Sequence, residues 1–120
     1  MSTIAVHSHN LPDMYLEALQ RSGITNIDGF PTPDWSLEAH LKMMDSHDIQ
    51  ACLLSLSSPG LEFAEPDIAV ELPRKINILL SEIIRDNPAR LGAFALLPLP
   101  NVEASLEGIA YALDVLKWDG

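Results

Sequence analysis

Three short apolar runs, separated by stretches with helical periodicity, restrict the fold of this 120-residue chain more than any other feature. The runs cover residues 4–7, 49–56 and 91–97. The middle run is apolar at most positions, which is typical of a strand covered on both faces in a parallel sheet. Alternation of strands with helices predicts an α/β fold with about three strand–helix units, parallel strands and right-handed crossovers.

Prolines, glycines and capping residues set the ends of the expected helices. The expected helices cover residues 12–21, 37–46 and 67–87 and a stretch that follows Asn101. Asp34 or Ser36 can cap the second helix, and Asn101 can cap the fourth. Pro73 lies inside the third helix and predicts either a kink or a start close to that proline. Residues 24–34 are rich in glycine and proline and are expected to form a loop.

Composition and charge exclude several classes of partner. The net charge is −10, with seven basic and seventeen acidic residues, which is a poor match for nucleic acid or an anionic membrane. The one cysteine, Cys52, lies in an apolar run, so we expect a buried thiol in a reducing compartment. No apolar run has the length of a membrane span and the first residues lack a signal-peptide pattern, so a cytoplasmic protein is expected.

The first apolar run ends in His7-Ser8-His9. In an extended chain the side chains at i and i+2 point the same way, so His7 and His9 are expected to project from one face of a strand end. Neutral imidazole is a good ligand for zinc and similar divalent ions. A bare His-x-His is also common as two strand-end histidines that bond to nearby backbone, so the pattern alone leaves both interpretations open.

Other polar and sulfur-containing residues are assigned structural roles. We expect His40 to be a packing or surface residue and His47 to sit at a helix end, where a positive charge is favoured. Turn or core roles are expected for Ser55, Ser57, Ser58, Trp35, Met43 and Met44, and loop-stabilising hydrogen bonds for Arg74 and Asn77.

Several stretches together carry a family resemblance, in a fixed order over nearly all of the chain. They are Val6-His7-Ser8-His9 with Leu11-Pro12, the stretch from Trp35 to Leu41, Leu54-Ser55-Leu56-Ser57-Ser58-Pro59-Gly60, Arg74 with Asn77, and the stretch from Arg90 to Pro100. The set resembles the N-terminal part of the amidohydrolase-related metal-dependent decarboxylases. That family includes aminocarboxymuconate-semialdehyde decarboxylase and the decarboxylases of gamma-resorcylate and 6-methylsalicylate, and the Ser-Ser-Pro-Gly stretch is similar to the last of these.

The resemblance implies that residues 1–120 form one incomplete domain, the N-terminal part of a TIM-like (β/α)₈ barrel. It implies one divalent ion, zinc or manganese, at the C-terminal mouth of that barrel, and no organic cofactor. His7 and His9 would be the first two metal ligands, with a histidine from a middle strand and an aspartate from the last strand completing the set. The implied reaction is non-oxidative decarboxylation of an aromatic or unsaturated carboxylic acid, with that aspartate as the proton donor to the ring carbon.

Two departures from the family pattern matter for these expectations. Family members often carry an acidic residue two positions before the first histidine, where this chain has Ala5. A (β/α)₈ barrel takes about 250 residues, so this chain supplies about three of eight units and has no counterpart of the later histidine and aspartate. We therefore expect the chain to be inactive as a decarboxylase on its own.

Two other functions are compatible with the sequence. One is hydrolysis of a lactone or amide, since metal-bound water is a good nucleophile near neutral pH. The other is a non-catalytic fragment whose unpaired strand edges lead it to pair with itself as a homo-oligomer. For the enzyme interpretations, the expected partner is a small carboxylic acid or acyl substrate, with no nucleic acid and no membrane.

Overall fold

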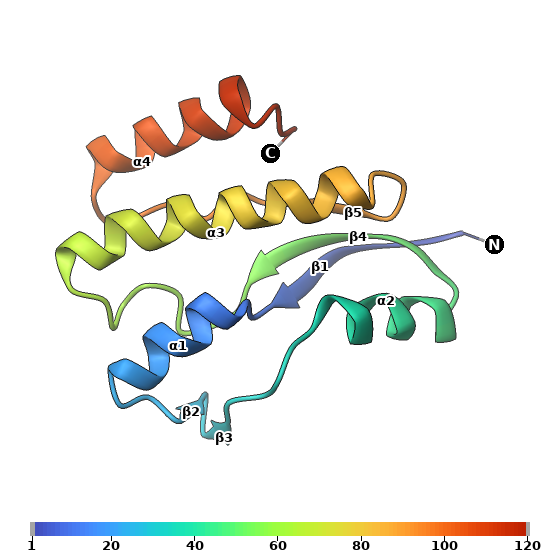
Figure 1. Cartoon of the computed structure of the whole chain (residues 1–120), viewed down its shortest axis with the longest axis horizontal. Coiled ribbons are helices and arrows are strands. Elements are labelled where there is room, and N and C mark those ends of the chain that lie inside the picture. The colour runs from blue at the N-terminus through green and yellow to red at the C-terminus, as the bar shows by residue number, and fades with distance from the viewer. Residues whose placement is uncertain (1, 120) are drawn as a thin grey trace.

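The fold is built on a three-stranded parallel sheet, seen in a computed structural model that describes residues 2–119. The strands are β1 (Thr3–Asn10), β4 (Ile49–Leu56) and β5 (Leu91–Ala93), in the spatial order β1-β4-β5 (Figure 1). Both pairs of neighbours are parallel. The predicted α/β class and the three parallel strands are therefore confirmed.

Four helices connect and follow the strands: α1 (Asp13–Arg21), α2 (Leu37–Ser46), α3 (Pro66–Asp86) and α4 (Val102–Ala110). A π-helical turn, η1 (Tyr111–Val115), continues α4. Two of the predicted caps are present, because the Ser36 hydroxyl accepts from the Ala39 amide at 3.1 Å and the Asn101 side chain accepts from the Ala104 amide at 3.0 Å. Each cap satisfies a backbone N–H that the first helical turn would otherwise leave unpaired.

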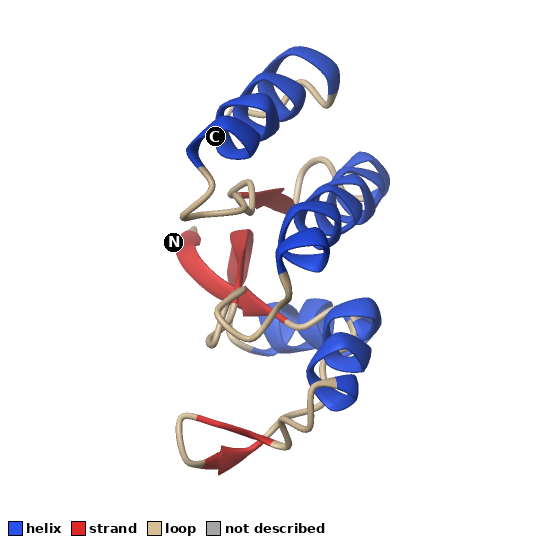
Figure 2. Cartoon of the chain, turned by 90° about the vertical axis from the view of Figure 1, so that its left-hand side faces the viewer, coloured by secondary structure: helices blue, strands red, loops and turns tan. Residues whose placement is uncertain are grey.

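The helices α1, α2 and α3 gather on one side of the sheet, as Figure 2 shows. The core lies between these helices and that face of the sheet, and it is centred on Cys52 and Leu54 of β4. The fully buried side chains around them are Tyr15, Leu19, Met44, Ile76 and Leu80. We call this side of the sheet the covered face.

The other side of the sheet, which we call the open face, carries the alternate residues of the same strands. Ile4 and Val6 of β1 are 62% and 64% exposed, and Phe94, just after β5, is 45% exposed. Among the described residues, Figure 2 shows no helix over this side of the sheet, and Phe94 borders a cavity that Ile109 of α4 and Leu113 of η1 also line. The sheet of this chain is thus covered on one side only.

The third strand is shorter than the predicted 91–97, because it ends at Ala93. Beyond the strand end, Asn77 of α3 donates to the Leu96 carbonyl and accepts from the Leu96 amide, both at 2.9 Å. The amide group of Asn77 thereby replaces a neighbouring strand as the partner of the Leu96 backbone. The expected loop-stabilising role of Asn77 is confirmed.

Pro73 does not delay the third helix, so the predicted start near this residue is wrong. The helix begins at Pro66, seven residues earlier, and continues past Pro73 to Asp86. Pro66 occupies the first turn, where a missing N–H has no cost. Pro73 itself is buried, so its ring contributes apolar contact at the position where the helix loses a hydrogen bond.

A small hairpin forms inside the region that was expected to be loop. Strands β2 (Asn26–Ile27) and β3 (Phe30–Pro31) pair antiparallel around Asp28 and Gly29, whose φ angles are 51° and 85°. Positive φ at both central residues is the geometry for which an Asp-Gly pair is favoured. The sequence signal was present, but two-residue strands are too short to show a periodic pattern.

No helix among the described residues combines the length and the apolar character that a bilayer crossing requires. Residues 118 and 119, which follow the last helical turn, are not in a strand.

Candidate metal centre

The histidine pair lies at the carboxyl end of β1, next to the end of β4 (Figure 1). Between Ala5 and Ser8 the register shifts, so that β1 has one residue more than β4 over this span. The extra residue is a bulge, a feature that re-aims side chains and is frequent beside active sites. Beyond it, Ser8 turns to the covered face while His7 and His9 turn to the open face. Sequence reasoning missed the bulge, for which an apolar run offers no signal.

The two imidazole rings face each other. Their Nε2 atoms are 3.0 Å apart and their ring centroids 4.8 Å apart, with the planes inclined at 73°. Both side chains are exposed. At this separation one neutral ring can donate an Nε2–H hydrogen bond to the other, or both nitrogens can turn their lone pairs to one cation. The predicted placement of His7 and His9 on one side of the strand is what the geometry shows.

The spacing of the nitrogens fits a shared divalent ion. Two ligands at about 2.0–2.1 Å from a tetrahedral zinc ion are about 3.3–3.4 Å apart. Neighbouring ligands of an octahedral ion at about 2.1 Å are about 3.0 Å apart. The observed 3.0 Å between the Nε2 atoms is within a few tenths of an ångström of both values. The donor set therefore fits two positions of a metal site.

A complete ligand set is not present in residues 2–119, where no group of three or more His, Cys, Asp or Glu side chains is placed to hold a metal. Catalytic zinc sites usually have three protein ligands, so two imidazoles alone make a weak site. The assignment of His7 and His9 as ligands stays a prediction.

His40 lies directly behind the histidine pair, on the covered face. It is 7% exposed, and its Nε2 atom is 3.3 Å from the Ser8 hydroxyl. The indole Nε1–H of Trp35 donates to its Nδ1 at 3.3 Å. Burial lowers the pKa of His40, which favours the neutral ring. The expected packing role is thus only part of its function, because both ring nitrogens make polar contacts that sequence periodicity could not reveal.

Two polar side chains near the strand ends are buried and have no protein partner among the described residues. They are Asn10, at the end of β1, and Ser55, which lies opposite His9 in the β1–β4 register. A buried polar group without a hydrogen bond costs roughly 1–3 kcal/mol. Ser57, by contrast, takes part in the expected turn, since its carbonyl accepts from the Gly60 amide at 3.3 Å.

Tyr15 ties the loop after β4 to α1. Its hydroxyl donates to the Gly60 carbonyl at 2.8 Å, and the side chain is fully buried. Burial raises the pKa of Tyr15 to about 12, and the hydrogen bond to Gly60 offsets part of that rise. The phenol is therefore a structural group at neutral pH.

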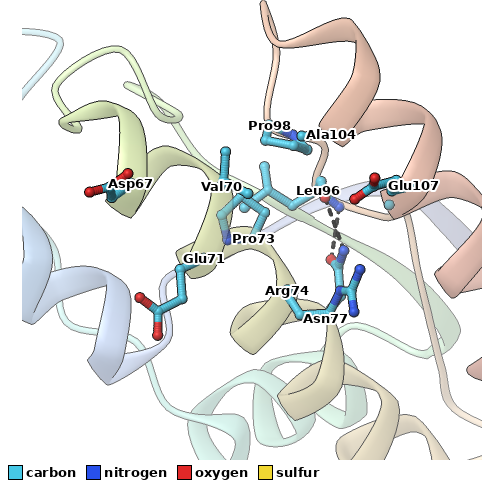
Figure 3. A pocket seen from close by; sticks show the side chains of 11 residues that line it. Asp67, Val70, Glu71, Pro73, Arg74, Asn77, Leu96, Pro98, Ala104 and Glu107 are labelled. Atoms are coloured by element: carbon cyan, nitrogen blue, oxygen red, sulfur yellow. Dashed lines mark hydrogen bonds between the residues drawn. The ribbon is translucent and has the colours of Figure 1, made fainter.

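A cavity of about 440 Å³ lies between α3 and α4 (Figure 3). Asp67, Glu71, Arg74, Asn77 and Glu107 are among its lining residues. The Arg74 guanidinium lies 3.8 Å from the centre of the Tyr111 ring, so it joins α3 to η1 by a cation–π contact. Neither histidine of the pair lines this cavity, so we do not assign it to the metal centre.

His47, Cys52 and the methionines remain structural. His47 is exposed just after α2 and its Nδ1 lies 3.0 Å from both the Met43 carbonyl and the Ser46 hydroxyl. Cys52 is fully buried, as predicted, and burial raises the pKa of its thiol. Met44 is in the core and Met43 packs against it.

No family model matches the chain. Curated relatives do. A decarboxylase of Aspergillus niger is 37% identical over 125 residues, an alignment that covers 100% of this chain and 34% of the relative. A 6-methylsalicylic acid decarboxylase of Aspergillus aculeatus is 35% identical and covers 98% of this chain and 36% of the relative. The chain thus spans about a third of the length of the curated relatives it matches.

Solved structures show the same relationship. A protein described as an amidohydrolase II superposes with a TM-score of 0.92 at 34% identity, over 98% of this chain and 39% of its own. A dihydroxybenzoic acid decarboxylase of Polaromonas, solved with manganese and the inhibitor 2-nitroresorcinol, superposes with a TM-score of 0.65 at 21% identity. The superposition covers 98% of this chain and 36% of the Polaromonas protein. At that sequence identity the match supports the fold alone.

The sequence and structure comparisons agree that the chain matches one group of proteins and that it matches only part of their length. The three parallel strands and their helices are part of an amidohydrolase-type TIM barrel. By sequence and by fold, this chain is a relative of the amidohydrolase-type decarboxylases and corresponds to about a third of their length.

Proposed function

We propose that this chain supplies two metal-binding imidazoles to the active site of a non-oxidative decarboxylase of small aromatic carboxylic acids. The observation that carries the proposal is the 3.0 Å separation of the His7 and His9 Nε2 atoms on the open face, at the carboxyl end of β1. In TIM-barrel enzymes this end of the strands is where active sites form. Relatives named as decarboxylases favour this reaction over hydrolysis of a lactone or amide.

The substrate class follows from the relatives. One acts on 6-methylsalicylic acid, and others are named for gamma-resorcylate. Both compounds carry a carboxylate beside a phenolic hydroxyl, a pair of oxygens that suits a hard divalent cation. A bound divalent ion would supply a Lewis acid for those oxygens.

The residues of this chain hold and orient such a site from one side. His7 and His9 present two neutral nitrogen donors to the open face, while the covered face fixes the strand behind them. Among residues 2–119, no third metal-ligating side chain joins the pair. The family resemblance assigns the proton that replaces the carboxylate on the ring carbon to an aspartate on the last strand of the barrel.

Calorimetric titration with Zn²⁺ and, separately, Mn²⁺ tests the metal half of this proposal. We expect one equivalent to bind to the chain, and His7→Ala or His9→Ala to weaken binding at least tenfold. His47→Ala is the matched control, because it removes an exposed imidazole far along the chain from the pair. Equal affinity of all four proteins would contradict the assignment and leave the pair as two hydrogen-bonded histidines.

A chimera tests the chemical half. Residues 1–120 replace the matching third of the Aspergillus aculeatus 6-methylsalicylic acid decarboxylase, and release of CO2 from 6-methylsalicylate is measured. We expect the chimera to turn over substrate, His9→Ala within it to abolish turnover, and the isolated chain to be inactive. Turnover that survives His9→Ala would rule out the proposed role.

A further inference from the structure

Ser8 joins the histidine pair to the covered face. It lies between His7 and His9 in β1, and its side chain turns the opposite way from theirs. Its hydroxyl oxygen is 3.3 Å from Nε2 of His40 in α2. A hydrogen bond at Ser8 therefore fixes the rotation of the strand from which both imidazoles project.

The contacts of His40 determine which of its nitrogens carries the proton. Indole Nε1–H can only donate, so the Trp35 contact at 3.3 Å requires a lone pair on Nδ1 of His40. The neutral ring then carries its hydrogen on Nε2 and donates it to the Ser8 oxygen. The result is a directed chain of hydrogen bonds from Trp35 through His40 to Ser8.

The series of hydrogen bonds reaches the middle of the sheet. Ser8 lies opposite Leu54 of β4, which is fully buried in the core. The series Trp35–His40–Ser8 thus connects the segment before α2, α2 itself and β1.

β1 needs such an anchor more than the other strands. It is an edge of the described sheet, with β4 as its one neighbour there, and its ladder is interrupted by the register shift between Ala5 and Ser8. Backbone hydrogen bonds alone leave the rotation of a bulged edge strand loosely defined. Metal sites depend on groups behind the ligands for orientation, and loss of such groups typically costs about 10–100-fold in affinity.

We propose that Trp35, His40 and Ser8 are positioning residues for the His7–His9 pair, acting as a directed hydrogen-bond relay that fixes the direction of both imidazoles. The inference rests on the proposed function for its metal-binding consequence. The relay itself is a property of the structure that can be measured without metal.

The first test measures the tautomer of His40 in the metal-free chain. Nitrogen-15 NMR of the imidazoles should show His40 as a single Nε2–H tautomer, and Trp35→Phe should produce a mixture by removing the donor to Nδ1. Trp118→Phe is the control for loss of an indole. A wild-type His40 with its hydrogen on Nδ1 would overturn the relay.

The second test reads the position of the ligands. Proton–proton cross-peaks between the His7 and His9 rings should be strong in the wild type and should weaken in Ser8→Ala and His40→Leu. Ser46→Ala is the matched control, because it also removes a hydroxyl that contacts a histidine, here His47. Unchanged cross-peaks in a folded Ser8→Ala chain would overturn the proposal, and Trp35→Phe gives the same test if Ser8→Ala does not fold.

The third test separates this inference from the proposed function. Ser8→Ala should weaken Zn²⁺ or Mn²⁺ binding about tenfold while its urea unfolding midpoint stays close to that of Ser46→Ala. Wild-type affinity in Ser8→Ala would contradict the positioning role. If the wild-type chain binds neither ion, the metal assignment fails, and the tautomer and cross-peak measurements still decide whether the relay orients the two rings.

Discussion

The two faces of the same three-stranded sheet differ in what covers them. On the covered face, Cys52 and Leu54 have no exposed surface, and α1, α2 and α3 pack over them. On the open face, Ile4 and Val6 remain more than half exposed, and the histidine pair is freely accessible. Burial of an apolar side chain contributes roughly 1.5–3 kcal/mol, so the stability of this chain depends mainly on the covered face.

The sequence of β4 explains why the open face is apolar. Leu53 alternates with the buried Cys52 and Leu54, so the strand offers apolar side chains to both sides. That pattern is typical of a strand whose two faces are both covered. In a (β/α)₈ barrel the second cover is the packed interior formed by the other strands. The difference between the faces therefore indicates that the open face is the interior side of a barrel.

The largest expected difference in unfolding free energy comes from truncating one side chain on each face to alanine. Leu54→Ala should lower the free energy of unfolding by roughly 2–5 kcal/mol, because it leaves a cavity in the core. Val6→Ala should lower it by less than about 0.5 kcal/mol, as is usual for surface positions. Urea unfolding curves of the two variants provide the measurement.

A large loss of unfolding free energy in Val6→Ala would contradict the difference between the covered face and the open face. It would mean that the open face is covered in solution by a second copy of the chain, the self-pairing that the unpaired strand edges allow. Size-exclusion chromatography then distinguishes a dimer from a monomer. A monomer with a small Val6→Ala effect leaves the comparison intact.

Asn77 gives the next largest effect, on the covered side. Asn77→Ala removes both hydrogen bonds to the Leu96 backbone and should cost about 2–3 kcal/mol in unfolding free energy, since a buried amide and carbonyl lose their partners. Asn87→Ala is the control, because it removes a single bond, at 3.0 Å, to the Ile83 carbonyl. Equal costs for the two variants would show that the segment after β5 does not depend on Asn77.

Local sequence signals predicted the elements that local chemistry decides. The bounds of α2 and β4 agree with the expected 37–46 and 49–56, because the Ser36 cap and a mostly apolar run define them within a few residues. The side shared by His7 and His9 followed from simple alternation. These features need no knowledge of distant contacts.

Features that depend on distant contacts could not be predicted. The backbone just after β5 is held by Asn77, which is 19 residues away from Leu96 in the sequence. The polar contacts of His40 depend on Ser8, 32 residues earlier. Helical periodicity identified His40 as a packing residue, and only the fold shows that its neighbours on that face include a hydroxyl and an indole N–H.

Tyr15 adds a smaller, pH-dependent effect to the covered face. Tyr15→Phe should cost about 1 kcal/mol at neutral pH, through loss of the 2.8 Å bond to Gly60. The pKa of Tyr15 in the fold is about 12, above its ordinary value of 10.0, so the folded chain keeps this proton longer than the unfolded chain does. Its contribution is therefore complete below pH 10 and is lost as the pH rises from 10 to 12.

Urea unfolding at pH 9 to 12 measures this contribution. The wild-type chain should lose stability faster than Tyr15→Phe over that interval, and its curve should cross that of Tyr15→Phe before pH 12, because a rise of the pKa from 10.0 to about 12 corresponds to more than the roughly 1 kcal/mol of the hydrogen bond. Tyr111→Phe serves as the control tyrosine. Parallel curves for wild type and Tyr15→Phe would show that the phenol reaches solvent in the folded chain.

The smallest expected effect concerns His40, which lies on the covered face behind the histidine pair. Burial lowers the pKa of His40, so between that value and about 6.5 the unfolded chain binds a proton that the folded chain does not. Stability should therefore fall as the pH drops below about 6.5, with a slope from this group of at most about 1.4 kcal/mol per pH unit. His40→Gln should reduce that slope between pH 7 and pH 5, which urea unfolding at a series of pH values measures.

The fall in stability at acid pH also tests the direction of the hydrogen bonds behind the His7–His9 pair. A charged His40 carries hydrogens on both ring nitrogens, and its Nδ1–H would then face the indole N–H of Trp35. Two donors cannot share that contact, so protonation must break the Trp35–His40 bond. The contrary result would be that His40→Gln leaves the pH dependence of the unfolding free energy at its wild-type value. His40 would then bind a proton as easily in the folded chain as in the unfolded chain. The ordered series of hydrogen bonds to Ser8 could not hold near neutral pH in that case.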